Sequence, residues 1–250
     1  MGNVRSLANK TDELAALVKD QREYRESSVL CFTETWLKGI IPDCLVEPDG
    51  STVVRADRDK QSGKQKGGGL AVFVNSRWCN PRHITVKERI CTPDMELLAV
   101  SLRPYYLPRE FSHCIIVTVY IQPSAVAAQA TDVIHSTVAG LQTRHPSAFI
   151  IVNGDFNHVR VSRALSNFTQ YVTCNTRHNK TLDLLYANIK EAYSATVLPP
   201  LGGSDHNLIR LVPTYKPVVR RQPATTRTVQ QWSVEVEEEL RECYRSTDWE

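Results

Sequence analysis

The sequence lacks any apolar stretch that could cross a membrane. Its longest apolar stretches are the five to seven residues around Leu70–Val74, Cys114–Tyr120 and Ala148–Val152, whereas a membrane-spanning helix needs roughly 20 apolar residues. The opening Met-Gly-Asn-Val-Arg-Ser-Leu lacks the charged segment and apolar core of a secretory signal and fits a myristoylation site poorly. We therefore expect a protein of the nucleus or cytoplasm that makes no membrane contact.

Paired cysteines are also missing. The seven cysteines are an odd number, are widely scattered and include no Cys-x-x-Cys pair, the spacing that is typical of zinc sites. Several lie inside apolar runs, where a reduced cysteine behaves as a small packing residue. The sequence thus predicts neither a disulfide framework nor a zinc site.

An excess of charge of one sign is absent as well. The 30 Lys and Arg residues nearly balance the 27 Asp and Glu residues, which leaves a net charge of +3. This mild charge permits a phosphate-bearing partner but does not establish one. The basic, Gly-rich segment 55–69 is interpreted as a loop whose residues at 55–66, with Arg103 or Arg109, are candidates for holding the backbone phosphates of such a partner. A solvated connection between two strands explains the same composition.

The chain is organised around residues 147–157, Ser-Ala-Phe-Ile-Ile-Val-Asn-Gly-Asp-Phe-Asn. The apolar run Ala148–Val152 predicts a strand covered on both faces, and Asn153-Gly154 predicts the turn that ends it. Asp155 and Asn157 follow two positions apart, so in an extended segment they lie on one face, a carboxylate beside an amide. Taken alone, an Asx turn that closes an ordinary strand explains these residues equally well.

Polar residues mark the ends of other expected strands in the same way. The pattern predicts strands at Val29–Thr33, Met95–Leu102, His113–Tyr120, Thr181–Tyr186 and Leu208–Thr214, with helices from Thr11 and over Ser124–Arg144. The polar residues at or beside the strand ends are Asn3, Glu34, Tyr120, Asp155, Asn157, Asp183, Asp205 and His206. In open α/β sheets, ligands bind at strand ends. Oxygen ligands with one imidazole and no thiol suit Mg²⁺ or Mn²⁺.

These residues lie in motifs that resemble a known superfamily. In chain order the motifs are Asn3-x-x-Ser-Leu, Glu34-Thr-Trp, Tyr120-x-x-Pro, Gly154-Asp155-Phe156-Asn157, Thr181-x-Asp183 and Ser204-Asp205-His206. They resemble the ordered motifs of the endonuclease/exonuclease/phosphatase superfamily over residues 2 to about 214. The phrases Thr-Glu-Thr-Trp-Leu, Lys-Gly-Gly-Gly-Leu-Ala-Val-Phe-Val and Gly-Gly-Ser-Asp-His are most similar to the apurinic-type endonuclease of non-LTR retrotransposons.

The resemblance implies both a fold and a metal. The expected fold is a two-sheet α/β sandwich of the DNase I-like type, whose motif loops converge at one edge and cleave a phosphodiester bond with a divalent cation. In such a site Glu34 would bind Mg²⁺, with Mn²⁺ as the alternative, and Asn3 and Asp205 would support it. The cation would place positive charge against the scissile phosphate of DNA.

The resemblance also assigns the chemistry to residues. Asp155 and Asn157 would position and activate the attacking water or assist the leaving oxygen. Tyr120 would donate a hydrogen bond to the phosphate. His206 would stabilise charge on the phosphoryl oxygens, and Asp183 would fix the tautomer of its imidazole and favour the charged form.

Two features depart from the family pattern. The first strand is expected to be truncated, because the chain begins just ahead of Asn3. Beyond residue 216 a Pro- and Arg-rich linker leads into an acidic amphipathic helix at Val234–Cys243. We expect an endonuclease-type domain over 1–215 and an appended segment over 216–250, which resembles the connector to a reverse transcriptase in a larger polyprotein.

Three functions are open on these grounds. The leading hypothesis is a Mg²⁺-dependent endonuclease that nicks DNA for retrotransposition. A phosphatase or exonuclease of the same fold would share the chemistry and differ in substrate. A catalytically inactive remnant that binds nucleic acid or protein would keep the surface without hydrolysis; the truncated first strand favours it, whereas the filled motifs oppose it.

Overall fold

The protein is described by a computed structural model that covers residues 1–64, 66–217, 228 and 232–249. Contacts within the chain divide it into two units, Met1–Val218 and Val219–Glu250. Among the described residues, no helix is both long and apolar enough to span a membrane. All seven cysteines are free.

The second unit contains one helix, α4 (Val234–Ser246), among its described residues. Its amino end is capped by Ser233, whose Oγ accepts a hydrogen bond from the Val236 N–H. The predicted Pro- and Arg-rich linker falls mainly on 218–227 and 229–231, outside the described residues. A role as a connector to a polymerase stays a prediction.

The first unit alternates strands with a few helices. The strands are β1 (Gly2–Asn3), β2 (Val29–Thr33), β3 (Ser51–Ala56), β4 (Leu70–Asn75), β5 (Ile84–Cys91), β6 (Met95–Leu102), β7 (Cys114–Ile121), β8 (Phe149–Asp155), β9 (Thr169–Gln170), β10 (Asp183–Ala187), β11 (Tyr193–Leu198) and β12 (Leu208–Pro213). The α-helices are α1 (Thr11–Asp20), α2 (Arg22–Arg25) and α3 (Ala127–Arg144). Short 3-10 helices lie at Asp43–Leu45, Lys60–Ser62 and Pro81–His83.

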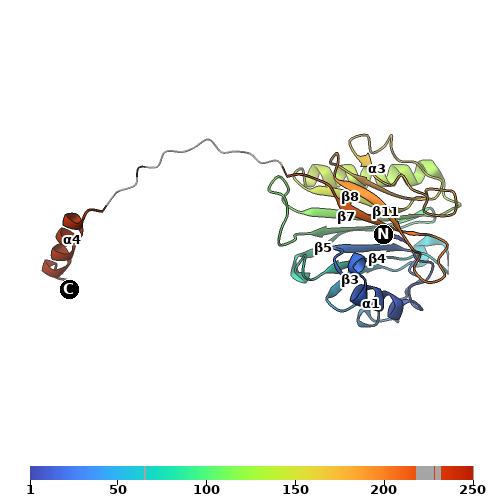
Figure 1. Ribbon diagram of the computed structural model, residues 1–250. Coiled ribbons are helices and arrows are strands. Elements are labelled where there is room, and N and C mark those ends of the chain that lie inside the picture. Colours follow the sequence, from blue (N-terminus) through green and yellow to red (C-terminus); the bar gives the residue numbers. More distant parts are fainter. Residues whose placement is uncertain (65, 218–227, 229–231, 250) are drawn as a thin grey trace. The chain divides into compact units, whose positions relative to one another are not determined.

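Two mixed sheets pack face to face in this unit, with helices on their outer faces (Figure 1). One sheet has the order β1-β2-β4-β3 and the other β5-β6-β7-β8-β10-β9, while β11 and β12 form a separate hairpin. Apolar side chains of α3 pack on the larger sheet, those of α1 pack on the smaller one, and a third cluster fills the space between the sheets. This arrangement confirms the predicted two-sheet α/β sandwich.

Strand β8 runs further than its sequence pattern predicts. We expected it to end at Val152, with Asn153-Gly154 as a turn, but pairing continues to Asp155, opposite Tyr120 of β7 and Asp183 of β10. Gly154 has a φ of 137°, and a Cβ there would lie 1.9 Å from the Val119 carbonyl oxygen. The glycine therefore serves close approach of two strands rather than a turn.

Other differences have equally local causes. Strands β5 and β11 were not expected, because their side chains are only partly buried and their patterns are mixed. Helix α3 starts at Ala127, with Val126 rather than Ser124 at its N-cap position. The first strand, β1, comprises Gly2–Asn3 and pairs in parallel with β2.

Candidate active site

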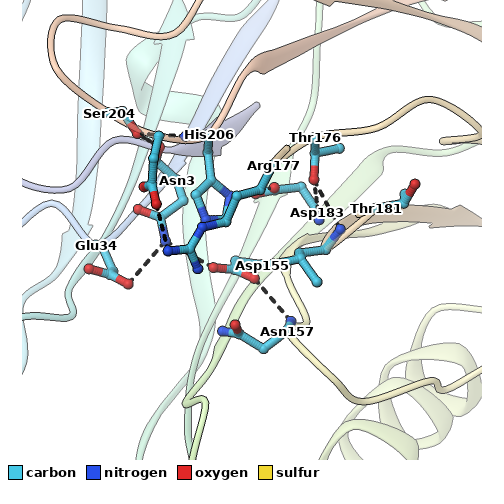
Figure 2. A network of polar contacts seen from close by, with 12 residues as sticks. Asn3, Glu34, Asp155, Asn157, Thr176, Arg177, Thr181, Asp183, Ser204 and His206 are labelled. Atoms are coloured by element: carbon cyan, nitrogen blue, oxygen red, sulfur yellow. Dashed lines mark hydrogen bonds and ion pairs between the residues drawn. The ribbon is translucent and has the colours of Figure 1, made fainter. Parts of the chain in front are cut away.

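The amide of Asn3 links two carboxylates that come from different strand ends. Its Nδ2 donates to Glu34 Oε1 at 3.0 Å and to Asp155 Oδ2 at 2.9 Å (Figure 2). Its Oδ1 accepts from the Arg5 N–H at 3.1 Å. The amide nitrogen, not the oxygen that would bind a metal, therefore faces the carboxylates. Asn3 acts as a positioning residue between Glu34 and Asp155.

Glu34 is held in an unusual backbone conformation just after β2. Its φ is 52°, in the left-handed region that non-glycine residues rarely adopt. The next two residues are tied to the Gly-rich loop, since Thr35 N–H donates to the Gly69 carbonyl (3.1 Å) and Trp36 N–H to the Gly68 carbonyl (2.8 Å). The Trp36 indole also donates to Glu34 Oε2 at 3.2 Å. These bonds aim the Glu34 carboxylate at Asn3.

Tyr120 lies beside this carboxylate at the end of β7 and is buried. Burial raises the pKa of its phenol, and the negative charge of Glu34 and a hydrogen bond to that carboxylate raise it further. The guanidinium of Arg58 lies 5.7 Å from the ring centroid. The phenol therefore stays protonated at neutral pH and can act as a hydrogen-bond donor.

Asp155 is a nearly fully buried carboxylate at the end of β8. Burial, followed by the charge of Asp183, raises its pKa to about 7, although His206 and the Asn3 amide act in the opposite direction. Asn157 has a φ of 50°, and its backbone N–H donates to Asp155 Oδ1 at 3.0 Å. The Asn157 side chain also donates to the Ile121 carbonyl at 2.7 Å, which ties the segment after β8 to the end of β7.

His206 and Asp183 form a buried hydrogen-bonded pair. His206 Nδ1 and Asp183 Oδ2 are 2.7 Å apart, and both side chains are buried. Burial by itself lowers the pKa of His206, but the hydrogen bond and charge of Asp183 and the charge of Asp155 outweigh it, so the pKa is raised. Because Nδ1 faces a carboxylate, it carries a proton and Nε2 is left for a ligand.

Asp205 is bound by two guanidinium groups. Arg5 Nη1 lies 3.1 Å from Asp205 Oδ1, and Arg177 Nη2 lies 2.5 Å from Oδ2. Burial acts to raise the pKa of Asp205, yet these arginines lower it overall. These ion pairs favour a role for Asp205 in holding the side chains of Arg5 and Arg177 beside His206, rather than the metal-ligand role expected from the motif. No local spacing in the sequence marks Arg5 or Arg177, because their link is made only by the fold.

The donor set fits a hard divalent cation. Asp155, Asp183 and His206 offer ligand atoms that lie within 4.8 Å of one another. Asp183 Oδ1 is buried and has no hydrogen-bond partner among the described residues, which is costly for a carboxylate oxygen unless a bound group satisfies it. Glu34 adds a further, partly exposed carboxylate. Carboxylates without thiols suit Mg²⁺ or Mn²⁺.

The basic loop is less available for DNA than its composition suggests. Arg55 pairs with Asp43 and Asp57, and Arg58 pairs with the buried Glu96. Both arginine side chains are less than a tenth exposed, so they stabilise the loop instead of facing a ligand. Asp57 lies in the loop itself, but Asp43 and Glu96 lie 12 and 38 residues from their arginine partners, so the sequence pattern does not indicate these pairs.

Arg103 and Arg109 follow the end of β6 that lies away from the candidate site. The start of β6, at Met95, pairs with Ile121 beside the site, whereas its end, at Leu102, pairs with Cys114. Strands of this length span on the order of 25 Å. Arg103 and Arg109 follow β6 and are therefore separated from Tyr120 by the length of the strands. Their contact with DNA backbone phosphates stays a prediction.

Comparisons with solved structures show the same fold. An AP endonuclease, LMAP from Leishmania major, matches with 14% identity over 84% of this chain and 85% of that chain, with a TM-score of 0.61. Truncated TDP2 from Caenorhabditis elegans matches with 15% identity over 82% and 90%, with a TM-score of 0.55. The human Nocturnin catalytic domain with bound sulfate matches with 14% identity over 84% and 91%, with a TM-score of 0.52.

Sequence comparisons assign the family. Comparison with curated protein sequences gives no match. Residues 2–206, which include every residue of the site described above, match the endonuclease/exonuclease/phosphatase family. The chain therefore belongs to the endonuclease/exonuclease/phosphatase family.

Proposed function

We propose that the chain is a divalent-metal-dependent phosphodiesterase that nicks DNA. The observation that carries the proposal is that the fold brings together residues far apart in the sequence. Asn3 bridges Glu34 to Asp155, and Asp155 lies beside the hydrogen-bonded pair of Asp183 and His206. A base, a polarised imidazole and a partly exposed carboxylate thus meet at one edge of the sandwich. Together these groups can supply the proton transfer and charge stabilisation that phosphodiester hydrolysis uses.

Each side chain has a role that its surroundings support. A bound Mg²⁺ or Mn²⁺, held by Glu34, would supply positive charge against the phosphate. Asp155, whose pKa is about 7, accepts a proton from the attacking water, since a base works best when its pKa is near the operating pH. His206 in its charged form and the protonated Tyr120 donate hydrogen bonds to phosphate oxygens, which stabilises the charge that develops there.

DNA is the favoured substrate class. Similar folds include an AP endonuclease from Leishmania major and a D. rerio TDP2 complexed with a single-strand DNA product. Arg5 and Arg177, held by Asp205 beside His206, are partly exposed cations at the site, and such side chains bind backbone phosphates without reading sequence. The Thr-Glu-Thr-Trp-Leu phrase at 33–37 and the appended segment 216–250 favour a retrotransposon polyprotein as the origin.

Nicking of supercoiled plasmid tests the proposal. The wild-type chain should nick plasmid with Mg²⁺ and lose this activity in EDTA and in Asp155→Ala. The matched control is Asp132→Asn, which changes an exposed carboxylate on α3 and should nick at the wild-type rate. Urea unfolding of each variant establishes that it is folded.

Two other outcomes would replace the proposal. Folded protein that leaves plasmid intact but hydrolyses nucleotides or inositol phosphates in a Mg²⁺-dependent way would assign the site to a phosphatase or exonuclease. Folded protein that binds DNA without hydrolysing any of these substrates would identify a catalytically inactive binding remnant.

A further inference from the structure

Trp36 is a large aromatic residue that stays partly in solvent between two buried neighbours. Its relative exposure is 41%, whereas Thr35 and Leu37 are 0% and 3% exposed. Leu37 belongs to the apolar cluster between α1 and the smaller sheet. A single exposed apolar residue needs no special explanation by itself. The contacts that hold Trp36 and its closeness to Glu34 set it apart.

The backbone of Trp36 has a conformation that few side chains adopt. Its φ is 55°, and Glu34, two residues earlier, has a φ of 52°. Values in this left-handed region are uncommon for residues other than glycine, and they persist only where the surroundings hold them. The Trp36 N–H donates to the Gly68 carbonyl at 2.8 Å. Strained residues of this kind are concentrated at binding and catalytic sites, which makes Trp36 a candidate for such a role.

The Gly-rich loop makes room for the segment that carries Trp36. A Cβ at Gly67 would lie 3.6 Å from Trp36 Nε1, and a Cβ at Gly69 would lie 2.6 Å from Thr35 Oγ1. Both glycines have a positive φ, of 80° and 87°. A side chain at Gly69 would displace Thr35 and, with it, the indole. The loop therefore packs against the nitrogen-bearing edge of the ring and against the residue before it.

Arg55 holds the chain just after Trp36. Its Nη2 donates to the Lys38 carbonyl at 3.0 Å and its Nη1 to the Ile41 carbonyl at 2.7 Å. The Arg55 side chain is itself buried by these contacts and by its two carboxylate partners. The indole thus projects from a backbone that is fixed on both sides. A ligand that contacts a ring already held in place loses little affinity to ordering.

The indole N–H is bound to the carboxylate of Glu34. Trp36 Nε1 donates to Glu34 Oε2 at 3.2 Å, while Asn3 Nδ2 donates to Oε1 at 3.0 Å. Each carboxylate oxygen therefore has a donor, and together the two donors fix its orientation. An indole has only one donor, so the edge of the ring is committed to Glu34. What Trp36 still has to offer a ligand is the exposed part of its ring.

We propose that Trp36 stacks on a nucleobase of the substrate beside the phosphate that is cut, and that its N–H positions Glu34. The proposal rests on the proposed function, because Glu34 is there the residue that faces the scissile phosphate through the metal. A base is joined to its own phosphates through a single sugar. A ring held at 3.2 Å from the Glu34 carboxylate can therefore reach only bases next to that phosphate.

The stacking role defines a class of substrate. Every base has a flat face, so stacking on an aromatic side chain is tolerant of sequence. Phosphoesters without a base, such as inositol phosphates, gain nothing from Trp36. A base inside a duplex is already stacked on both of its faces, so the ring favours DNA that is single-stranded or opened beside the cut. Trp36 thus selects polynucleotides with an unpaired base over other phosphoesters.

Two substitutions separate the two tasks of Trp36. Trp36→Leu removes the aromatic ring and should raise the KM for a single-stranded oligodeoxynucleotide about 5- to 150-fold at saturating Mg²⁺, the effect of one lost base stack. Trp36→Phe keeps a ring but removes the N–H, so its KM should stay close to that of the wild type. It should instead raise the Mg²⁺ concentration for half-maximal hydrolysis about three- to tenfold, the effect of one lost hydrogen bond.

Fluorescence reports the stacking without hydrolysis. The probe is a single-stranded oligothymidylate that carries 2-aminopurine at alternate positions, bound in EDTA. Its fluorescence should fall on binding to the wild type and to Trp36→Phe, but not to Trp36→Leu. The matched control is Tyr106→Leu, which removes an 89% exposed aromatic ring after the end of β6 that lies away from the site. It should leave the fluorescence change, the KM and the Mg²⁺ requirement as in the wild type, and urea unfolding establishes that all variants are folded.

The outcomes distinguish this inference from the proposed function. Wild-type protein that hydrolyses DNA, with the same KM and the same fluorescence change in Trp36→Leu, would refute the stacking and leave the proposed function intact. A raised Mg²⁺ requirement in both variants with an unchanged KM would show that Trp36 only positions Glu34. If the wild type hydrolyses no DNA, the proposed function fails, and the fluorescence change still decides whether Trp36 stacks on a base. Tighter wild-type binding of a strand with the same phosphates but no bases would also refute the stacking.

Discussion

Asp183 and Asp155 lie directly opposite each other across the antiparallel pair of β10 and β8. Two carboxylates in such a cross-strand position repel each other when both are charged, and the charge of Asp183 is one of the causes that raise the pKa of Asp155. The His206 imidazole, hydrogen-bonded to Asp183, lies against the same pair. In the proposed mechanism the two carboxylates have different tasks: Asp183 orients the imidazole, and Asp155 exchanges a proton.

Replacing Asp183 by Asn should lower the nicking rate by about two to four orders of magnitude without unfolding the protein. The amide keeps the size of the side chain, but it removes the charge that favours the imidazolium form of His206 and can donate to Nδ1, which moves the ring proton to Nε2. Nitrogen NMR shifts of His206 report that change of tautomer. An intact wild-type tautomer together with wild-type nicking would contradict the role given to the pair.

The free energy of unfolding of the metal-free chain should fall as the pH rises from 5 to 8. Asp155 has a folded pKa of about 7 against an ordinary value of 3.8, so between these values the folded state holds a proton that the unfolded state has released. The pKa of His206 is raised above 6.5, so above that value the folded state again holds more protons. Both groups therefore stabilise the fold less as the pH rises.

Urea unfolding in EDTA at several pH values measures this dependence. Asp155→Asn should make the slope shallower, because it removes one of the two titrating groups. Asp132→Asn, on the exposed face of α3, should leave the slope as it is in the wild type. An equal slope in the wild type and in Asp155→Asn would refute the raised pKa.

Replacing Gly154 by Ala should destabilise the protein by about 2–4 kcal/mol. The residue has a φ of 137°, and a Cβ would lie 1.9 Å from the Val119 carbonyl oxygen, which belongs to a buried strand and cannot move aside. Gly140 in α3 is the matched control, because a Cβ there would meet only Arg144, at 3.8 Å. Gly140→Ala should stabilise by about 0.5–1 kcal/mol. Equal effects of the two changes in urea unfolding would refute the close approach.

Gly154 also shows what a local sequence pattern cannot predict. The grouping of Asn3, Glu34, Asp155, Asp183 and His206 could be predicted, because each lies at or beside a strand end and the motifs occur in one order along the chain. Their catalytic roles stay predictions, and Arg5 and Arg177 could not be found from the sequence pattern. The prediction of a turn at Asn153-Gly154 was wrong. A glycine needed for contact between two strands has the same local pattern as a glycine needed for a turn. The local pattern contains nothing about Val119, the strand neighbour that decides between them.

The contacts of the arginines in the basic loop are also absent from the local sequence pattern. Arg55 and Arg58 look like solvated loop residues, and Arg103 looks as available as they do. Only the fold shows that the first two are buried against carboxylates and that the third lies at the far end of β6. Charge composition indicates that cations are present, but pairing over long sequence distances decides which of them can bind a phosphate.

Breaking the buried pair of Arg58 and Glu96 should affect stability and the site together. Both side chains are less than a tenth exposed, and Glu96 Oε2 accepts from the Gly69 N–H at 2.6 Å. Glu96→Gln leaves the guanidinium charge without a counter-charge, which costs about 3–5 kcal/mol in other buried pairs. It also weakens the Gly-rich loop that holds Thr35 and, through it, Glu34.

Urea unfolding and Mg²⁺-dependent nicking separate the two effects. Glu96→Gln should unfold at lower urea and require a higher Mg²⁺ concentration for half-maximal nicking, since the Glu34 carboxylate is less well held. Glu26→Gln, which breaks the exposed pair with Arg22, should change stability by less than about 0.5 kcal/mol and leave the Mg²⁺ requirement alone. The double variant Arg58→Met with Glu96→Leu should regain much of the stability, because no unpaired charge remains buried. If the double variant regains stability but still needs the higher Mg²⁺ concentration, the hydrogen bond from Gly69 to Glu96, and not the ion pair, is what positions Glu34.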